Sequence, residues 1–158
     1  MVVAPAPADA DLEGPPMPSP LQWYEAPLTE RMELVRRGVP ANWLLESQQA
    51  MALTRNALCE LLGLKVSTVN RKLLNRSLLN PDESERLMGL QRLIGQVEVL
   101  VRDCGDGSPF EAGRWLADWL QRPNRALGGV RPAAFMDTAE GREQVGRLIG
   151  AQRSGSYM

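Results

Sequence analysis

Apolar residues recur every three to four positions through most of the chain from Leu28 onward, which is the spacing of one face of an α-helix. No stretch alternates apolar and polar residues as a half-buried strand does. The longest helical pattern starts at Asn80 and Pro81, which suit an N-cap and a first helical turn. It carries one apolar stripe, made of Leu87, Leu90, Leu93, Ile94, Val97 and Val101. The pattern predicts an all-α fold with a long helix that faces a core or a partner helix.

The first part of the chain has a different composition. Residues 1–20 hold six of the 12 prolines and show no period. Such a segment cannot bury enough apolar surface to offset the entropy lost on folding. We therefore expect a mobile leader without a fold of its own, and we extend it to residue 27 because the first helical pattern begins at Leu28.

A helix-turn-helix pattern occupies the segment from Thr54 to Arg76. Two short amphipathic stretches meet at Gly63, where the chain can adopt a positive φ and turn sharply, and Ser67 suits the N-cap of the second helix. Leucines and valines of both stretches would fill the wedge between the helices. An ordinary helical hairpin inside a bundle has similar spacing, so both interpretations stay open at this point.

The second of these helices carries side chains that can bind DNA. The residues that would contact base edges and phosphates are Lys65, Ser67, Thr68, Asn70, Arg71, Asn75 and Arg76. The whole chain has a formal net charge of -1, but the segment from Thr54 to Asn80 has five cationic side chains and one acidic one. A basic face on a neutral protein favours a local polyanion site. Lys72 departs from the pattern, because such motifs usually have an apolar residue at this position.

The chemistry available to the chain argues against an enzyme. The sequence has no histidine, which removes the most frequent general base and zinc ligand, and it has no C-x-x-C motif. Cys59 and Cys104 lie in apolar helical patterns, so we expect two buried, reduced thiols, with a single disulfide as the alternative. Asp118 and Asp137 are the only conceivable catalytic groups, and no nucleophile or phosphate loop accompanies them. We expect no enzymatic activity, no cofactor and no metal.

Membrane and secretion signals are missing from the sequence. No apolar run approaches the roughly 18 residues that a membrane span needs. The N-terminal segment has neither the basic start nor the continuous apolar stretch of a signal peptide. We expect a cytoplasmic protein without membrane contact.

The last third of the chain contains a turn, rich in proline and glycine, between two predicted helices. A helix that carries Trp115 and Trp119 on its apolar side stops at proline, and Thr138 suits the N-cap of the final helix. Both tryptophans are better explained as core residues than as binding hot spots. The residues with turn-forming geometry between the two helices are Pro123, Asn124, Gly128, Gly129 and Pro132.

The segment WLADWLQRPNRALGGVRPAAFMDTAEGREQVGRLIGAQRSGSY resembles the C-terminal toxin-binding domain of the Xre/MbcA/ParS family of antitoxins. The resemblance covers Trp115 to about Tyr157, and its densest part, W-L-x-x-P-N-x-A-L-G-G-x-x-P, is far more specific than a lone glycine motif. The Xre/Cro-like helix-turn-helix pattern upstream is compatible with the same family. The leader (1–27), which composition indicates, lies outside the resemblance. For the rest of the chain we expect a helix-turn-helix DNA-binding domain (28–80), a connecting and dimerisation helix (81–108) and a toxin-binding domain with a tail (109–158).

The resemblance also implies a function and partners. It implies an antitoxin of a type II toxin–antitoxin system that neutralises a RES-domain, NAD-degrading toxin by occluding its active site. It further implies a homodimer within a larger hetero-oligomer, and binding of operator DNA by the N-terminal domain. The toxin-binding residues would be Arg142, Arg147, Arg153, Ser154, Gly155, Ser156 and Tyr157. Without the resemblance, the arginines of the last helix would be read as a solvated face. The alternative function is a simple dimeric helix-turn-helix repressor without a toxin partner.

Overall fold

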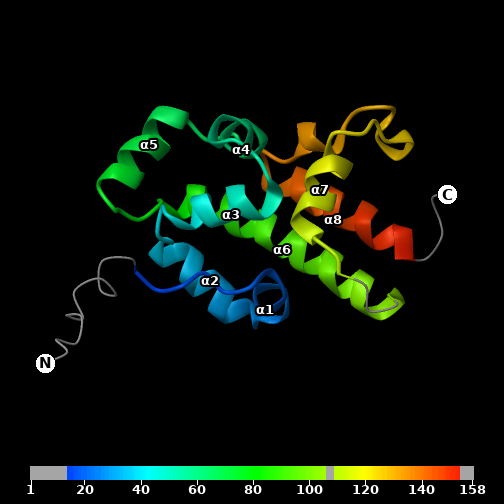
Figure 1. Ribbon diagram of the computed structural model, residues 1–158, viewed down its shortest axis with the longest axis horizontal. Coiled ribbons are helices and arrows are strands. Elements are labelled where there is room, and N and C mark those ends of the chain that lie inside the picture. The colour runs from blue at the N-terminus through cyan, green and yellow to red at the C-terminus, as the bar shows by residue number, and fades with distance from the viewer. Residues whose placement is uncertain (1–13, 106–108, 154–158) are drawn as a thin grey trace, which may run out of the picture.

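The computed structural model describes residues 14–105 and 109–153, and the regular secondary structure in these ranges is helical (Figure 1). The all-α prediction is confirmed. Two isolated bridges pair Pro40 with Leu78 and Asn124 with Val130. The elements are α1 (Pro20–Glu25), α2 (Leu28–Arg37), α3 (Trp43–Met51), α4 (Arg55–Leu62), α5 (Val66–Leu74), α6 (Pro81–Cys104), α7 (Ala112–Leu120), η2 (Arg125–Leu127), η3 (Pro132–Phe135) and α8 (Ala139–Arg153).

Helix α6 is the central element, against which α1, α2, α7 and α8 pack. Its start is fixed by a capping box, in which the Asn80 side chain accepts from the Glu83 amide and the Glu83 side chain accepts from the Asn80 amide, both at 2.8 Å. The apolar stripe predicted for this helix is buried within one chain from Leu87 to Val97. The other helices of the same chain cover this part of the stripe, so a partner chain would have to contact α6 elsewhere. Dimerisation itself stays a prediction.

The expectation that residues 1–27 have no fold is wrong for residues 14–27. Helix α1 forms with Ser19 and Gln22 in a capping box, and Trp23 is only 5% exposed. The indole nitrogen of Trp23 donates to the carbonyl of Met88 in α6, at 2.9 Å. Trp43 likewise donates to the carbonyl of Pro15, at 2.9 Å. The α1 helix has six residues, too few to show a period, and buried tryptophans rather than amphipathic spacing hold the segment in place.

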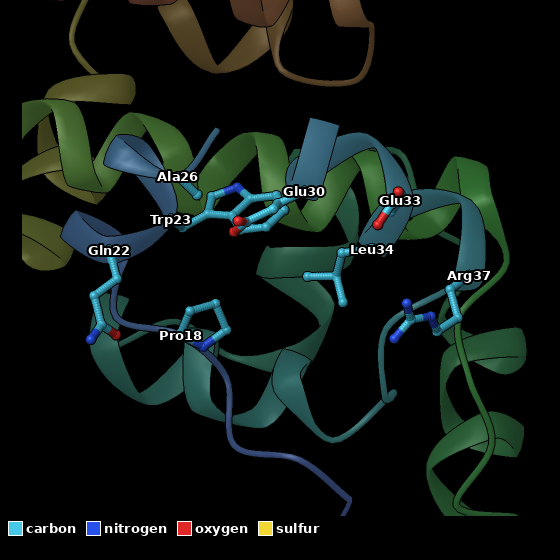
Figure 2. A pocket seen from close by; sticks show the side chains of 8 residues that line it. All are labelled: Pro18, Gln22, Trp23, Ala26, Glu30, Glu33, Leu34 and Arg37. Carbon is cyan, nitrogen blue, oxygen red and sulfur yellow. The ribbon is translucent and has the colours of Figure 1, made fainter. Parts of the chain in front are cut away.

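A surface pocket of about 490 Å³ lies between α1 and α2 (Figure 2). Pro18 and Leu34 point into it, and Glu30, Glu33 and Arg37 stand along α2. None of the residues predicted to bind DNA or toxin lines this pocket. The candidate functional surfaces are elsewhere in the molecule.

The turn between α7 and α8 is built from local hydrogen bonds. The Asn124 side chain accepts from the Ala126 amide at 2.9 Å, and Gly128 and Gly129 have φ values of +68° and +85°. Residues with a Cβ rarely adopt this left-handed conformation. Pro132 opens η3, which leads to the start of α8, where Thr138 accepts from the Gly141 amide at 3.0 Å. The turn brings the last helix back onto α6.

Candidate functional site

The helix-turn-helix geometry is set by caps and by a small apolar wedge. Thr54 caps α4 by accepting from the Ala57 amide at 3.1 Å, and Gly63 ends α4 with φ +68°. Leu58, Leu62 and Val69 are buried where α4 and α5 meet. Helix α5 begins at Val66, with Lys65 as its N-cap, so the prediction of Ser67 as N-cap is wrong. Residue 67 is therefore inside the helix.

The outer face of α5 presents most of the predicted DNA-binding residues to solvent. Ser67, Arg71 and Leu74 share one face by helical spacing and are exposed, Leu74 to 84%. Lys65, Asn75 and Arg76 are also exposed, whereas Thr68 and Asn70 are half-buried. The Asn70 amide oxygen accepts from Arg55 of α4 at 2.8 Å, so this side chain is already engaged.

The structure explains why a lysine occupies position 72, where such motifs usually have an apolar residue. Its ammonium group pairs with the carboxylate of Glu83, and the two side chains are only 16% and 12% exposed. Because Glu83 also belongs to the capping box of α6, the pair fastens α5 to the start of the central helix. Lys72 thus contributes packing and an ion pair to the fold rather than charge to the exposed face of α5.

Arg86 joins the helix-turn-helix to the C-terminal part of the chain. Its Nη1 donates to the carbonyl of Leu62, at 2.9 Å, and to the carbonyl of Asp137. A Cβ at Gly63 would lie 2.7 Å from this nitrogen and 2.9 Å from Cβ of Asp137. Arg86 has no signal in the sequence, because its partners are backbone atoms far away along the chain. The turn between α4 and α5 therefore rests directly against the segment that leads into α8.

Arg142 was predicted to contact a toxin, but the structure places it inside the protein. Its side chain is 5% exposed, and Nη2 donates to both oxygens of Glu85, at 2.7 and 2.6 Å. Nη1 donates to the carbonyl of Met136 at 2.9 Å. The guanidinium lies against Gly89, where a Cβ would come within 2.8 Å of Nε. A side chain that is buried and fully used within the fold is not available to a partner, so we remove Arg142 from the candidate set.

The rest of the C-terminal candidate surface lies along the outer side of α8. Arg147 is exposed and pairs with Glu143 one turn earlier, at 2.9 Å. Both residues border a groove of about 460 Å³ between α6 and α8, which Arg92 also lines. Arg153 is the last residue of α8. Its side chain and the whole of Ser154, Gly155, Ser156 and Tyr157 lie outside the described residues.

The aromatic residues of α7 form a stack at the edge of the core. Trp115 and Trp119 are nearly parallel, with ring centroids 6.0 Å apart, and Phe110 meets Trp115 at 6.4 Å. Trp119 is buried, Trp115 is half-buried and Phe110 is exposed. The core interpretation holds for Trp119, while Trp115 and Phe110 reach the surface.

The structure confirms the expected burial for one of the two cysteines. Cys59 is buried, whereas Cys104 is exposed, contrary to expectation, and neither forms a disulfide. Burial raises the pKa of the Cys59 thiol. Within residues 14–105 and 109–153, no cluster of three or more metal-ligating side chains occurs. In the same ranges no helix is long and apolar enough to cross a membrane.

The two candidate surfaces are far apart. Helix α5 lies at one end of the long axis of the molecule, and the C-terminal end of α8 lies toward the other (Figure 1). The central helix α6 runs between them.

Comparison with known proteins matches both halves of the chain. A family model described as the antitoxin Xre/MbcA/ParS C-terminal toxin-binding domain matches residues 108–155, and one described as the antitoxin Xre-like helix-turn-helix domain matches residues 30–92. The Prs ADP-ribosylating antitoxin of Sphingobium sp. (strain YBL2) is 37% identical over 134 residues, which are 85% of this chain and 84% of that protein. Antitoxin Xre of Photorhabdus laumondii subsp. laumondii is 25% identical over 117 residues, 74% of each chain.

Proposed function

Because this chain belongs to the Xre/MbcA/ParS family of antitoxins, we propose that it binds and neutralises a RES-domain toxin that consumes NAD. The observation that carries the proposal is that this chain joins a match to an antitoxin helix-turn-helix domain with a match to a toxin-binding domain. A relative named as an antitoxin, aligned over 85% of the chain, supports it. The exposed surface of α8 that carries Arg147 would hold the toxin.

The name of the Sphingobium relative supports an NAD-consuming partner. ADP-ribosylation breaks the bond between nicotinamide and ribose in NAD, and NAD hydrolysis breaks the same bond. A toxin with either activity must hold NAD in a cleft. An antitoxin that fills this cleft stops both reactions without any chemistry of its own, so we propose that the present chain is not an enzyme and needs no cofactor.

The end of the chain is the segment best suited to fill such a cleft. Helix α8 leads directly into residues 154–158, with the sequence SGSYM. Three small residues and one aromatic residue occupy little volume and can enter a nucleotide-shaped pocket. Arg147 and Arg153 would then bind acidic groups at the rim of the toxin's cleft.

The exposed face of α5 supports a second activity, binding of the promoter of the chain's own operon. Lys65, Arg71 and Arg76 are exposed cations on or beside one short helix. One such module contacts few base pairs, so we propose a homodimer that places two copies of α5 on two half-sites. The dimer contact must use a surface other than the buried stripe of α6, and the toxin complex would be a larger hetero-oligomer. We propose a cytoplasmic location, because NAD and promoter DNA are both available there.

Two variants of the full chain separate the two activities. Removal of residues 154–158 should abolish rescue of cells that co-express the RES-domain protein encoded beside this chain, with cellular NAD as the readout. The same variant should bind promoter DNA like the unaltered chain. Arg71→Ala should weaken promoter binding, because an exposed cation is lost from α5, and should leave rescue intact.

The plain-repressor alternative predicts a different outcome. In that case neither the unaltered chain nor any variant protects NAD or forms a complex with the RES-domain protein in a pull-down. Loss of NAD in the presence of the unaltered chain, with promoter binding retained, would therefore replace the antitoxin proposal with the repressor.

A further inference from the structure

A groove of about 700 Å³ lies beside the C-terminal end of α5. It begins at Gly14, the first described residue, and extends to the loop between α5 and α6. We call it the N-terminal groove. Its lining includes Gly14, Leu45, Arg55, Leu73, Arg76 and Leu78.

The N-terminal groove combines apolar and cationic surface. Leu45 and Leu78 are 41% and 50% exposed, and both line this groove. Arg55 and Arg76 supply two positive charges, and no acidic side chain is among the described residues that line the groove. Such a surface fits a segment that carries both carboxylates and an apolar side chain.

Arg76 is held at this groove by the backbone. Its φ is +51°, a left-handed conformation that is strained for a residue with a Cβ. The turn is fixed by the Arg76 amide, which donates to the Leu73 carbonyl at 3.3 Å, and by the Ser77 amide, which donates to the Lys72 carbonyl at 3.0 Å. The position of the Arg76 backbone is therefore set independently of any ligand.

The chain itself supplies a segment of matching chemistry next to the groove. Residues 9–13 read DADLE and contain Asp9, Asp11, Leu12 and Glu13, so three carboxylates flank one leucine. This segment is joined directly to Gly14, which lines the groove. An extended chain covers about 3.5 Å per residue, so all five residues remain within roughly 18 Å of Gly14.

We propose that Asp9–Glu13 binds in the N-terminal groove, with its carboxylates on Arg55 and Arg76 and Leu12 on Leu45 and Leu78. The occupied groove withdraws Arg76 from the end of the α5 surface, so the acidic segment competes with DNA phosphates. This regulation rests on the proposed DNA binding by α5. The binding of the segment in the groove does not depend on it.

Charge-neutral variants of the full chain test the competition. Asp9→Asn/Asp11→Asn/Glu13→Gln should bind promoter DNA about three- to ten-fold more tightly than the unaltered chain at low salt, with the difference shrinking as salt is added. The matched control is Glu111→Gln/Asp118→Asn/Glu140→Gln, which removes the same number of charges at exposed positions of the C-terminal domain. Equal affinities for the two triple variants would overturn the competition, because the gain would then reflect net charge alone.

A cross-link tests the docking directly. Leu12→Cys/Leu78→Cys in a Cys104→Ser background should form a disulfide within one chain under mild oxidation, and Leu12→Cys/Leu28→Cys, whose second cysteine would lie at an exposed position outside the groove, should not. Equal cross-linking of both pairs, or none, would overturn the docking. Disulfides between chains only would also overturn it and would assign the groove to a second copy. A cross-link within one chain, in a protein that binds no promoter DNA, would retain the docking and reject the DNA-binding proposal.

Discussion

The guanidinium of Arg142 in α8 holds the carboxylate of Glu85 in α6 through two hydrogen bonds, of 2.7 and 2.6 Å. The arginine is 5% exposed and the glutamate 42%. The third hydrogen bond, to the Met136 carbonyl, ties the same guanidinium to the residue that follows η3. One buried cation thus fixes the last helix, the central helix and the turn between them.

Arg142→Ala should lower the free energy of unfolding by about 2–4 kcal/mol, because it leaves the Met136 carbonyl and one side of Glu85 without a donor. Urea denaturation measures the change. Arg147→Ala is the matched control on the same helix, since Arg147 is 69% exposed, and it should cost no more than about 0.5 kcal/mol. Equal costs for the two variants would contradict the structural role of Arg142.

Gly63→Ala should destabilise the protein for two separate reasons. The residue has φ +68°, and a Cβ there would lie 2.7 Å from Arg86 Nη1 and 2.9 Å from Asp137 Cβ. Gly128→Ala separates the two effects, because Gly128 has the same φ and nothing within 4 Å of a Cβ. We expect about 1 kcal/mol for Gly128→Ala from backbone strain alone and about 2–3 kcal/mol for Gly63→Ala, by thermal or urea unfolding. Similar values would mean that Arg86 does not press against the turn.

Trp23→Phe tests whether the segment before Leu28 belongs to the fold. The substitution keeps an aromatic ring but removes the donor to the Met88 carbonyl, so the free energy of unfolding should fall by about 1–2 kcal/mol. Hydrogen exchange of the α1 amides should rise at the same time. A variant with unchanged stability and unchanged exchange would show that α1 does not pack on α6 in solution.

Glu98→Gln should stabilise the protein at neutral pH. Burial raises the pKa of Glu98 above its ordinary value of 4.5, although a hydrogen bond from the Leu21 backbone opposes the shift. A carboxyl group with a raised pKa in the folded state costs stability once the pH exceeds its pKa in the unfolded chain. The glutamine variant avoids that cost and keeps an acceptor for Leu21.

The advantage of Glu98→Gln should therefore shrink as the pH falls from 7 to about 4, where most of the carboxyl of the unaltered chain is protonated in both states. Urea denaturation at the two pH values measures it. Glu60→Gln on the exposed side of α4 controls for the loss of one negative charge. A gain of the same size at both pH values would mean that packing, rather than ionisation, accounts for the effect.

Local signals along the chain predict much of this fold. Thr54, Asn80 and Thr138 each cap the helix that the sequence predicts after them, because an N-cap acts on amides three residues away and needs no tertiary information. Gly38 and Gly63 likewise end their helices with positive φ. Element type and order follow from such short-range chemistry.

The errors involve residues whose role depends on distant partners. The arginines of α8 resemble those of a solvated helix face in the sequence. Only the contact of Arg142 with Glu85, 57 positions earlier, shows that this side chain lies inside the protein. The prolines of residues 14–27 led to the prediction of an unfolded leader. The short helix in this segment is instead held in place by the contact of Trp23 with Met88. Lys72 conflicts with the helical pattern until Glu83 is placed beside it.

The position of the central helix α6 limits how hybrid antitoxins can be built from two parent sequences. The match to the helix-turn-helix domain ends at residue 92, inside α6, and the toxin-binding match begins only at residue 108. A crossover between the two matched segments, at residues 93–107, falls in the last part of this helix of about 36 Å or directly after it. It must preserve Glu85 and Arg86 on one side of the crossover and the backbone around residue 137 on the other. Hybrid antitoxins should therefore function only when both parents share this set of contacts.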